Sequence, residues 1–201
     1  MQTPLRLVVL LSGGGTTLQN LLDRQVGTVV CVISNKADAF GLQRARRAGI
    51  ANHVVSRREC GDLATFSQRI FTLCEESHAD LICMAGFLQL LEIPSQWQGR
   101  VMNVHPSLLP AFGGKGYHGV HVHAAALEAG VKVSGCTVHF ADNQYDQGPI
   151  IVQKAVPVAE DDTPESLQAR VFAAECEAYP EAIALFATGR LRIEGRRVRV
   201  G

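Results

Sequence analysis

The chain has 201 residues, of which 47% are hydrophobic, with 19 Lys and Arg against 19 Asp and Glu. Its length fits one full-sized domain, and its apolar content excludes intrinsic disorder, which goes with few apolar residues and a large net charge. Balanced charge argues against a protein dedicated to nucleic acid, because neutralising phosphates takes a clear excess of Lys and Arg. We therefore expect one domain over residues 1–201 and no nucleic-acid partner.

The first apolar run, residues 7–11, is far shorter than the roughly 18 residues that cross a bilayer. It leads directly into Ser12 and three glycines without a small-residue cleavage pattern, which indicates a first strand and not a secretory signal. The six cysteines form no Cys-x-x-Cys pair and mostly stand in apolar runs, where they behave as small core residues. We expect a cytoplasmic protein with no membrane contact.

Apolar, β-branched runs alternate with segments of helical periodicity over the first hundred residues. Residues 5–11 predict a buried strand, and the next helix is expected to be capped by Thr16 or Thr17 and to end before Gly27. Further strands are expected at 28–33, 51–55 and 80–85, with helices at 38–48 and 62–78. This alternation predicts an α/β fold, Rossmann-like, with a mostly parallel twisted sheet and helices on both faces.

The second half is expected to continue the same sheet. A short strand at 101–104 leads into a Pro/Gly-rich loop at 105–119, and a helix at 122–129 and strands at 135–141 and 149–158 follow. Thr163 and Pro164 form a strong helix start, and that helix should break near Pro180 and end by Gly189. The Arg-rich end, residues 190–199, predicts a solvated hairpin.

The first strand-to-helix turn could bind a phosphate. Its residues are Gly13, Gly14, Gly15, Thr16 and Thr17. Glycines let the backbone approach a ligand closely, and the free amides at a helix start favour an anion. The turn lacks the Gly-Lys-Ser/Thr ending of an ATP-binding loop and the Gly-x-Gly-x-x-Gly pattern of a dinucleotide site, so a phosphate monoester fits better. A tight turn without a ligand is the alternative.

Two further segments carry polar side chains at strand ends. Asn103 and His105 stand on the same side of the strand before Pro106, at the carboxyl end, where open α/β sheets bind ligands. Asp146 lies in a polar loop after the strand at 135–141 and could orient an imidazole, raising its pKa and keeping it ready as a general acid. A turn histidine and a turn-forming aspartate are the alternatives. For His118, His121 and His123 we reject a metal site, because no Cys or carboxylate completes the ligand spacing.

Taken together, these residues resemble the formyltransferase family that uses 10-formyltetrahydrofolate, from Val8 to about Leu191. The matching stretches are the Ser12 to Gly15 turn, Ser34 to Ala39, Met84 to Phe87, Asn103 to Pro110, Gly135 to Phe140, Asp146 to Ile151, Glu175, and Tyr179 with Pro180. The Asn-x-His-Pro-Ser-Leu-Leu-Pro stretch marks formyl transfer from folate, and the phosphate turn with Ser-Asn-Lys-Ala-Asp-Ala narrows the acceptor to glycinamide ribonucleotide. Relatives acting on methionyl-tRNA or hydrolysing formyl-folate carry an added domain.

The resemblance implies an enzyme of purine biosynthesis that moves the formyl group of 10-formyltetrahydrofolate, its co-substrate, to the amine of glycinamide ribonucleotide without a metal. It implies a catalytic set of Asn103, His105 and Asp146, with substrate contacts from Gly13 to Thr17 and from Glu175. Contacts to the folate are implied for Leu88, Gln89, Leu90, Leu91, Asn103, Asp142, Asn143, Gln144, Tyr145 and Asp146. A monomer or weak homodimer is expected.

Two other functions are compatible with the sequence. One is a formyltransferase for an amino sugar or a related amine, against which the phosphate turn argues. The other is a non-catalytic phosphate-binding α/β protein, which has no need of Asn103, His105 and Asp146 together. The loop at residues 112–119 is expected to be a mobile flap, with Lys115 as a possible phosphate contact.

Overall fold

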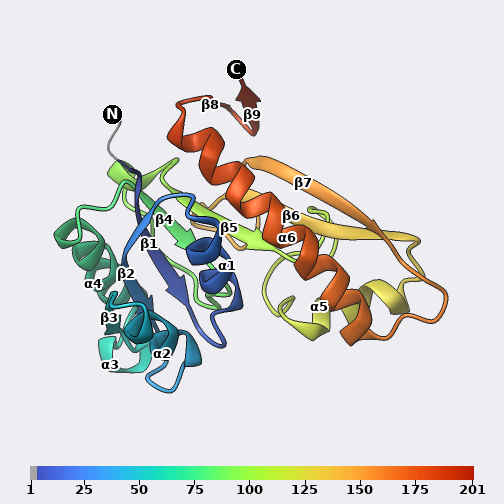
Figure 1. Ribbon diagram of the computed structural model, residues 1–201, viewed down its shortest axis with the longest axis horizontal. Helices are drawn as coiled ribbons and strands as arrows, with labels where there is room; N and C mark the ends of the chain where they lie inside the picture. Colours follow the sequence, from blue (N-terminus) through green and yellow to red (C-terminus); the bar gives the residue numbers. More distant parts are fainter. Residues whose placement is uncertain (1–3) are drawn as a thin grey trace. The chain divides into compact units, whose positions relative to one another are not determined.

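The computed structural model describes residues 4–201, and strands and helices alternate along its first hundred residues (Figure 1). Two units can be distinguished, one ending at Met102 and the other running from Asn103 to Gly201, and each is described by itself. This division does not test the expectation of one catalytic domain, which stays a prediction.

A parallel sheet forms the centre of the N-terminal unit, with strand order β3-β2-β1-β4. The central strand β1 is buried from Leu7 to Leu11, because it has a neighbour on each edge and is covered on both faces, as its continuous apolar sequence predicts. The strands are β1 (Arg6–Leu11), β2 (Thr28–Ser34), β3 (Ala51–Val54) and β4 (Leu81–Met84). The connecting helices are α1 (Thr16–Arg24), α2 (Phe40–Arg47), α3 (Arg57–Cys60) and α4 (Leu63–Glu76), and the short 3-10 helix η1 (Ser95–Trp97) follows β4.

The expected start of α1 is wrong in one respect. The helix is capped by Gly15 in the left-handed conformation, with φ 69°, and no side chain caps it. Because Thr16 and Thr17 lie inside the helix, neither can occupy the capping position. Asp62, by contrast, caps α4 with its side chain: its carboxylate accepts a hydrogen bond from the Thr65 amide at 2.7 Å.

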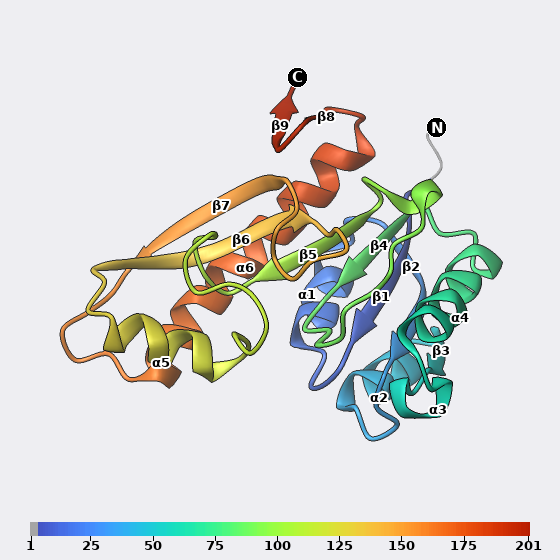
Figure 2. The same cartoon turned by 180° about the vertical axis from the view of Figure 1, so that it is seen from behind.

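The C-terminal unit is built on a long hairpin of β6 (Val133–Phe140) and β7 (Ile150–Pro157), which pair antiparallel. The helix α6 (Pro164–Ala187) packs along both strands and also contacts α5 (Val120–Glu128), as Figures 1 and 2 show. Strand β5 (Val101–His105) carries the first catalytic candidates at its end.

The expected break of the last long helix at Pro180 is wrong. The helix α6 runs through this residue, which lies buried in its interior. A proline removes one helical hydrogen bond, and burial of neighbours such as Val171, Ala178 and Ile183 keeps the helix together across the missing bond. Its start is as expected: Thr163 and Ser166 form a capping box, with Pro164 at the first turn.

The Arg-rich end is the expected exposed hairpin, made of β8 (Leu191–Glu194) and β9 (Arg197–Val200). Glu194 pairs with Arg192 at 3.3 Å and with Arg199 at 3.2 Å, so part of the positive charge is balanced within the hairpin. Strand β9 also pairs with β7 at Ile150, which attaches the hairpin to the sheet of this unit.

Candidate active site

The glycine turn after β1 is held from one side by α2. The carbonyl of Gly13 accepts a hydrogen bond from the Gly41 amide at 3.0 Å, and the carbonyl of Gly14 accepts one from Nε of Arg44 at 2.9 Å. Gly15 packs directly on Gly41: a Cβ added to Gly15 would lie 2.6 Å from the Gly41 Cα, so no larger residue fits. The sequence predicts the turn, and the structure shows that α2 holds the turn in place.

The amides of this turn suit an anion. Both Gly13 and Gly14 are exposed, and α1 begins immediately after Gly15 without a side chain over its first amides. These amides and the positive end of the helix dipole favour a phosphate. Of the five predicted phosphate contacts, Gly13, Gly14 and Gly15 lie in the turn and Thr16 and Thr17 in the first turn of α1, and their contact with a phosphate stays a prediction.

Ser12 connects this turn to the segment expected to touch the folate. Its hydroxyl donates to Oδ1 of Asn35 at 2.6 Å and accepts from the Leu88 amide at 2.9 Å. Leu88 is 39% exposed, but Leu91 is 2% exposed and packs into the core. Of the four predicted residues of this segment, Leu88 is therefore available to a ligand, and the side chain of Leu91 is not.

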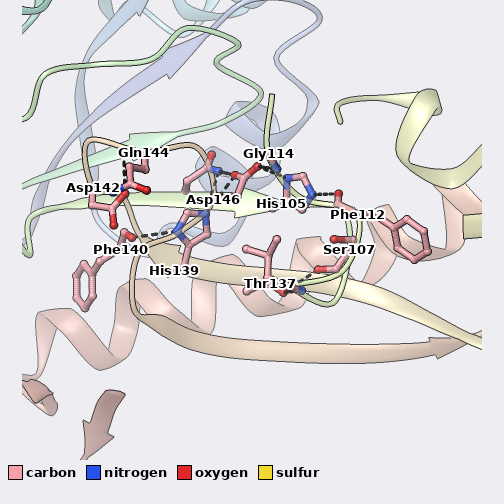
Figure 3. A network of polar contacts seen from close by, with 12 residues as sticks. His105, Ser107, Phe112, Gly114, Thr137, His139, Phe140, Asp142, Gln144 and Asp146 are labelled. Atoms are coloured by element: carbon pink, nitrogen blue, oxygen red, sulfur yellow. Dashed lines mark hydrogen bonds and ion pairs between the residues drawn. The ribbon is translucent and has the colours of Figure 1, made fainter. Parts of the chain in front are cut away.

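The three predicted catalytic side chains come together in the C-terminal unit, and Figure 3 shows His105 beside Asp146. Nδ1 of His105 lies 3.4 Å from Oδ2 of Asp146, and the Asn103 amide nitrogen donates to Oδ1 of the same carboxylate at 3.4 Å. His105 and Asp146 are thus paired as expected, although they are 41 positions apart in the numbering. Asn103 is the third member of the cluster.

The Asp146 charge raises the pKa of His105 as expected, but the net shift of this pKa is downward. Burial, at 4% exposure, lowers this pKa below its ordinary value of 6.5 and outweighs the Asp146 charge and the hydrogen bond to the Phe112 carbonyl, which both raise it. That carbonyl lies 2.8 Å from Nε2 of His105. The imidazole therefore has an acceptor at each nitrogen but an environment that disfavours its charge.

Asp146 is held as a carboxylate. Burial alone raises its pKa, but its contacts with His139 and with the Gly114 amide, together with the charge of His105, lower it. The Gly114 amide donates to Oδ2 at 2.9 Å, which attaches the loop at residues 112–119 to Asp146. The residue adopts φ 55°, a left-handed conformation that Asp tolerates better than most side chains.

His139 is a member of this cluster that sequence reasoning left without a role. Nδ1 of His139 lies 2.9 Å from the Phe140 carbonyl, so it carries the proton and Nε2 can accept from Asn103 at 3.2 Å. Nε2 also lies 3.6 Å from Oδ1 of Asp146. Its place at the end of β6, matching that of His105 at the end of β5, is the signal that could have identified it.

His123 on α5, one of the three histidines for which the sequence argues against a metal site, is buried. It is 1% exposed, and within residues 4–201 its Nδ1 has no hydrogen-bond partner. Burial lowers the pKa of His123, and the nearby His105 lowers it further. The described residues contain no group of three or more His, Cys, Asp or Glu side chains that could hold a metal ion.

Thr137 fixes the loop that follows His105. Its hydroxyl donates to the Ser107 carbonyl at 2.7 Å and accepts from the Leu109 amide at 3.0 Å, within the buried hairpin. Gln153 on β7 donates to Thr137 and to the Leu109 carbonyl, each at 3.0 Å. Because rigid strands supply these contacts, the chain beside His105 is held by the scaffold.

The other predicted residues are more dispersed. Asp142 accepts from the Gln144 amide at 2.9 Å and so shapes its own turn, while Asn143 and Gln144 are exposed and Tyr145 is half-buried. Glu175 on α6 is half-buried, and burial raises its pKa to about 7. In the part of the chain that the structure describes, Glu175 shares no hydrogen bond or ion pair with the catalytic cluster.

The site can be compared with known proteins. The profile of the Formyl transferase family matches residues 5–183 of the chain. The chain belongs to the formyl transferase family. A glycinamide ribonucleotide transformylase from Symbiobacterium toebii has the same fold, with a TM-score of 0.91 and 46% identity over 98% of this chain and 94% of that one.

Two curated relatives of this formyl transferase differ in length. The phosphoribosylglycinamide formyltransferase of Escherichia coli K12 is 40% identical over 94% of this chain and 90% of its own. The trifunctional purine biosynthetic protein adenosine-3 of Gallus gallus is 42% identical over 94% of this chain, which spans 19% of that protein, about a fifth of its length. Among the described residues, no helix is long and apolar enough to cross a membrane.

Proposed function

We propose that the chain transfers the formyl group of 10-formyltetrahydrofolate to the amine of glycinamide ribonucleotide in purine biosynthesis. The observation that carries the proposal is the cluster of Asn103, His105 and Asp146 at a strand end, in a member of the formyl transferase family. The acceptor follows from the name of the Escherichia coli relative, with which the chain aligns over most of both lengths. Residues 1–201 act as one catalytic domain in this proposal.

Each substrate group has a proposed set of contacts. The ribosyl phosphate is held by amides of the turn from Gly13 to Thr17, and the glycinamide by the Glu175 carboxylate. For the folate, the proposal keeps Leu88 to Leu90 and the loop from Asp142 to Asp146; Leu91 contributes only packing behind them.

The chemistry can be derived from the cluster. The acceptor amine attacks the formyl carbon, the C=O π pair moves to oxygen, and the Asn103 amide with the protonated form of His105 stabilises the oxyanion. The C–N10 bond then breaks as the C=O reforms. The amine loses one proton and N10 gains one, and Asp146, acting through water, relays this proton with His105. Burial lowers the pKa of His105 while Asp146 and the Phe112 carbonyl raise it, so the surroundings of the imidazole both oppose and support the charged form that the proton relay needs.

Turnover of purified protein with both substrates tests the proposal. Release of tetrahydrofolate, followed by absorbance, is expected with glycinamide ribonucleotide and not with an amino sugar nucleotide. Turnover with the amino sugar nucleotide alone would show that the chain formylates another class of acceptor. The absence of turnover with any amine would favour a phosphate-binding protein without formyltransferase activity. The proposal also carries the expectations of a cytoplasmic location, a monomer or weak homodimer, and no nucleic-acid partner.

A further inference from the structure

Arg44 on α2 makes contacts that join two elements of the proposed phosphate site. Its Nε donates to the Gly14 carbonyl at 2.9 Å, and its Nη1 donates to Oε1 of Gln19 on α1 at 3.2 Å. The Phe40 ring covers the guanidinium, with its centroid 5.1 Å from Cζ. A planar, forked cation is thus fixed between the glycine turn and the helix that follows it.

The contact with Gly14 determines the direction of a backbone amide. In a trans peptide, the carbonyl of one residue and the N–H of the next point in opposite directions. Because Arg44 holds the Gly14 carbonyl toward α2, the Gly15 N–H points away from α2. The Gly41 amide does the same for the preceding peptide, since it holds the Gly13 carbonyl at 3.0 Å and turns the Gly14 N–H outward.

The outward side of the turn is open. A Cβ added to Gly13 or Gly14 would meet no atom within 4 Å, and both residues are exposed. The amides of Gly14 and Gly15 therefore point away from α2, next to the exposed Gly13 and Gly14, while the carbonyls of the same two peptide groups, which would repel an anion, are engaged on the α2 side. The positive charge of Arg44 lies on that same side and favours an anion in front of the amides.

We propose that Arg44 is a positioning residue for phosphate recognition: it holds the Gly14 peptide so that the amides of the turn face the phosphate of the acceptor. This rests on the proposed function for the identity of the acceptor. A residue with this role contributes to binding of the phosphorylated acceptor and not to the transfer of the formyl group.

The kinetic test uses Arg44→Met, which keeps the aliphatic stem and removes the donors. The KM for glycinamide ribonucleotide should rise at least about tenfold, the scale of one charge-assisted hydrogen bond, while kcat and the KM for 10-formyltetrahydrofolate stay within about twofold. Arg44→Lys keeps the charge but lacks the planar set of guanidinium donors, so its KM for glycinamide ribonucleotide should lie between those of Arg44→Met and wild type. Arg46→Met is the matched control, since Arg46 is exposed on the same helix and its side chain has no hydrogen bond or ion pair among the described residues.

A phosphate-free acceptor separates positioning from general folding. With glycinamide riboside, kcat/KM of Arg44→Met should equal that of wild type, because the group that the turn recognises is missing. An equal loss on both acceptors would overturn the proposal, since it would mean that Arg44 only supports the fold.

Binding of inorganic phosphate tests the proposal without turnover. In the full chain, phosphate should shift the amide NMR signals of Gly14 and Gly15 in wild type and Arg46→Met, and about tenfold more phosphate should be needed in Arg44→Met. If wild type binds phosphate in this way but forms no product, the proposed function fails and the role of Arg44 stands. If Arg44→Met and Arg44→Lys bind phosphate as wild type does, the role of Arg44 is refuted. Should Arg44→Met not fold, as judged by circular dichroism, Arg44→Lys decides.

Discussion

His105 lies between the Asp146 carboxylate and the Phe112 carbonyl, and each of these contacts favours its protonated form. The net direction of its pKa is nevertheless downward, because burial penalises the imidazolium more than two partners stabilise it. For such a residue, the contribution of one partner is measured best by removing that partner alone.

We therefore predict that Asp146→Asn lowers the pKa of His105 further. The Asp146 charge raises this pKa, so its loss leaves burial with less opposition. The measurement is an NMR titration of the imidazole carbon signals in both proteins. An unchanged or higher pKa in the variant would show that the carboxylate does not act on His105.

His105→Ala and Asp146→Asn should each reduce the turnover number at least about a hundredfold, the scale of a lost general acid–base or oxyanion contribution. Steady-state kinetics at saturating substrates measures this. Asp161→Asn, in the exposed loop before α6, is the matched control and should turn over as wild type does. Near-normal turnover in either catalytic variant removes that residue from the mechanism.

At the scale of elements, the hairpin of β6 and β7 depends on close backbone contact beside the active site. A Cβ added to Gly148 would lie 1.7 Å from the Phe140 carbonyl oxygen. The same carbonyl oxygen lies 2.9 Å from Nδ1 of His139 and so orients that ring. The hairpin that carries Asp146 in its connecting loop therefore cannot accept a side chain at Gly148.

We expect Gly148→Ala to lower the melting temperature by more than about 5 °C, since relieving such an overlap costs on the order of 1–3 kcal/mol. Thermal unfolding followed by circular dichroism measures the change. Gly14→Ala, whose added methyl meets nothing within 4 Å, should unfold close to the wild-type temperature. Equal melting temperatures for the two variants would contradict the close contact at Gly148.

The start of α6 offers a test of pH dependence. Asp162 accepts hydrogen bonds from Arg170 at 2.6 and 2.9 Å and from Ser166 at 2.6 Å, and these contacts lower its pKa below the ordinary 3.8. A lowered pKa in the folded state stabilises the protein above the unfolded value and loses this contribution as the pH falls through the folded value. Asp162→Asn should therefore melt below wild type at pH 7, and the gap should narrow below pH 3.8, in thermal scans from pH 7 to 3. A gap independent of pH would refute the ion pair with Arg170.

Particular elements show why sequence reasoning succeeded and failed. Strand β1 was predictable because a strand buried on both faces reads as an unbroken apolar run. The continuation of α6 through Pro180 was not, because the proline rule is local and the packing that overrides it comes from distant residues. For the same reason, the sequence shows that Asn103, His105 and Asp146 are present but not that burial outweighs charge at His105.

Arg44 and His139 illustrate a second limit. The main partner of Arg44 is a backbone carbonyl 30 residues away, and no residue pattern encodes such a contact. His139 stands inside a stretch that was singled out from the sequence, but its role depends on which nitrogen the Phe140 carbonyl engages. Residue types near a site can be predicted from the sequence, whereas the direction of a backbone group requires the structure.

At the scale of the whole molecule, the zero net charge is compatible with the two anionic substrates of the proposed function. Amides at a helix start attract a phosphate without adding to the count of Lys and Arg, and Arg44 adds one charge behind them. The uneven positive charge at the chain end is partly offset by Glu194, so it does not by itself indicate a binding site.

The charged form of Glu175 should lower the stability of the fold, although the proposed function requires that charge. Burial raises the pKa of this carboxyl to about 7 from an ordinary 4.5, so the folded protein binds its proton more tightly than the unfolded chain does. The resulting stability is fully present below pH 4.5 and is lost as the pH rises through about 7. Above that pH, the folded protein carries the cost of a buried carboxylate, which the proposed function assigns to the glycinamide.

Glu175→Gln removes that cost. Relative to wild type, the variant should gain stability as the pH rises from 5 to 8, by a difference on the order of 1–3 kcal/mol. Denaturant unfolding at both pH values measures the gain, and Glu177→Gln, on the exposed side of the same helix, should show no comparable gain. At pH 8 the same Glu175→Gln protein should have a raised KM for glycinamide ribonucleotide, because the proposed function assigns substrate binding to the carboxylate that is costly to bury. A stability difference that stays constant with pH would mean that Glu175 titrates as an ordinary surface carboxyl, and the trade-off would not exist.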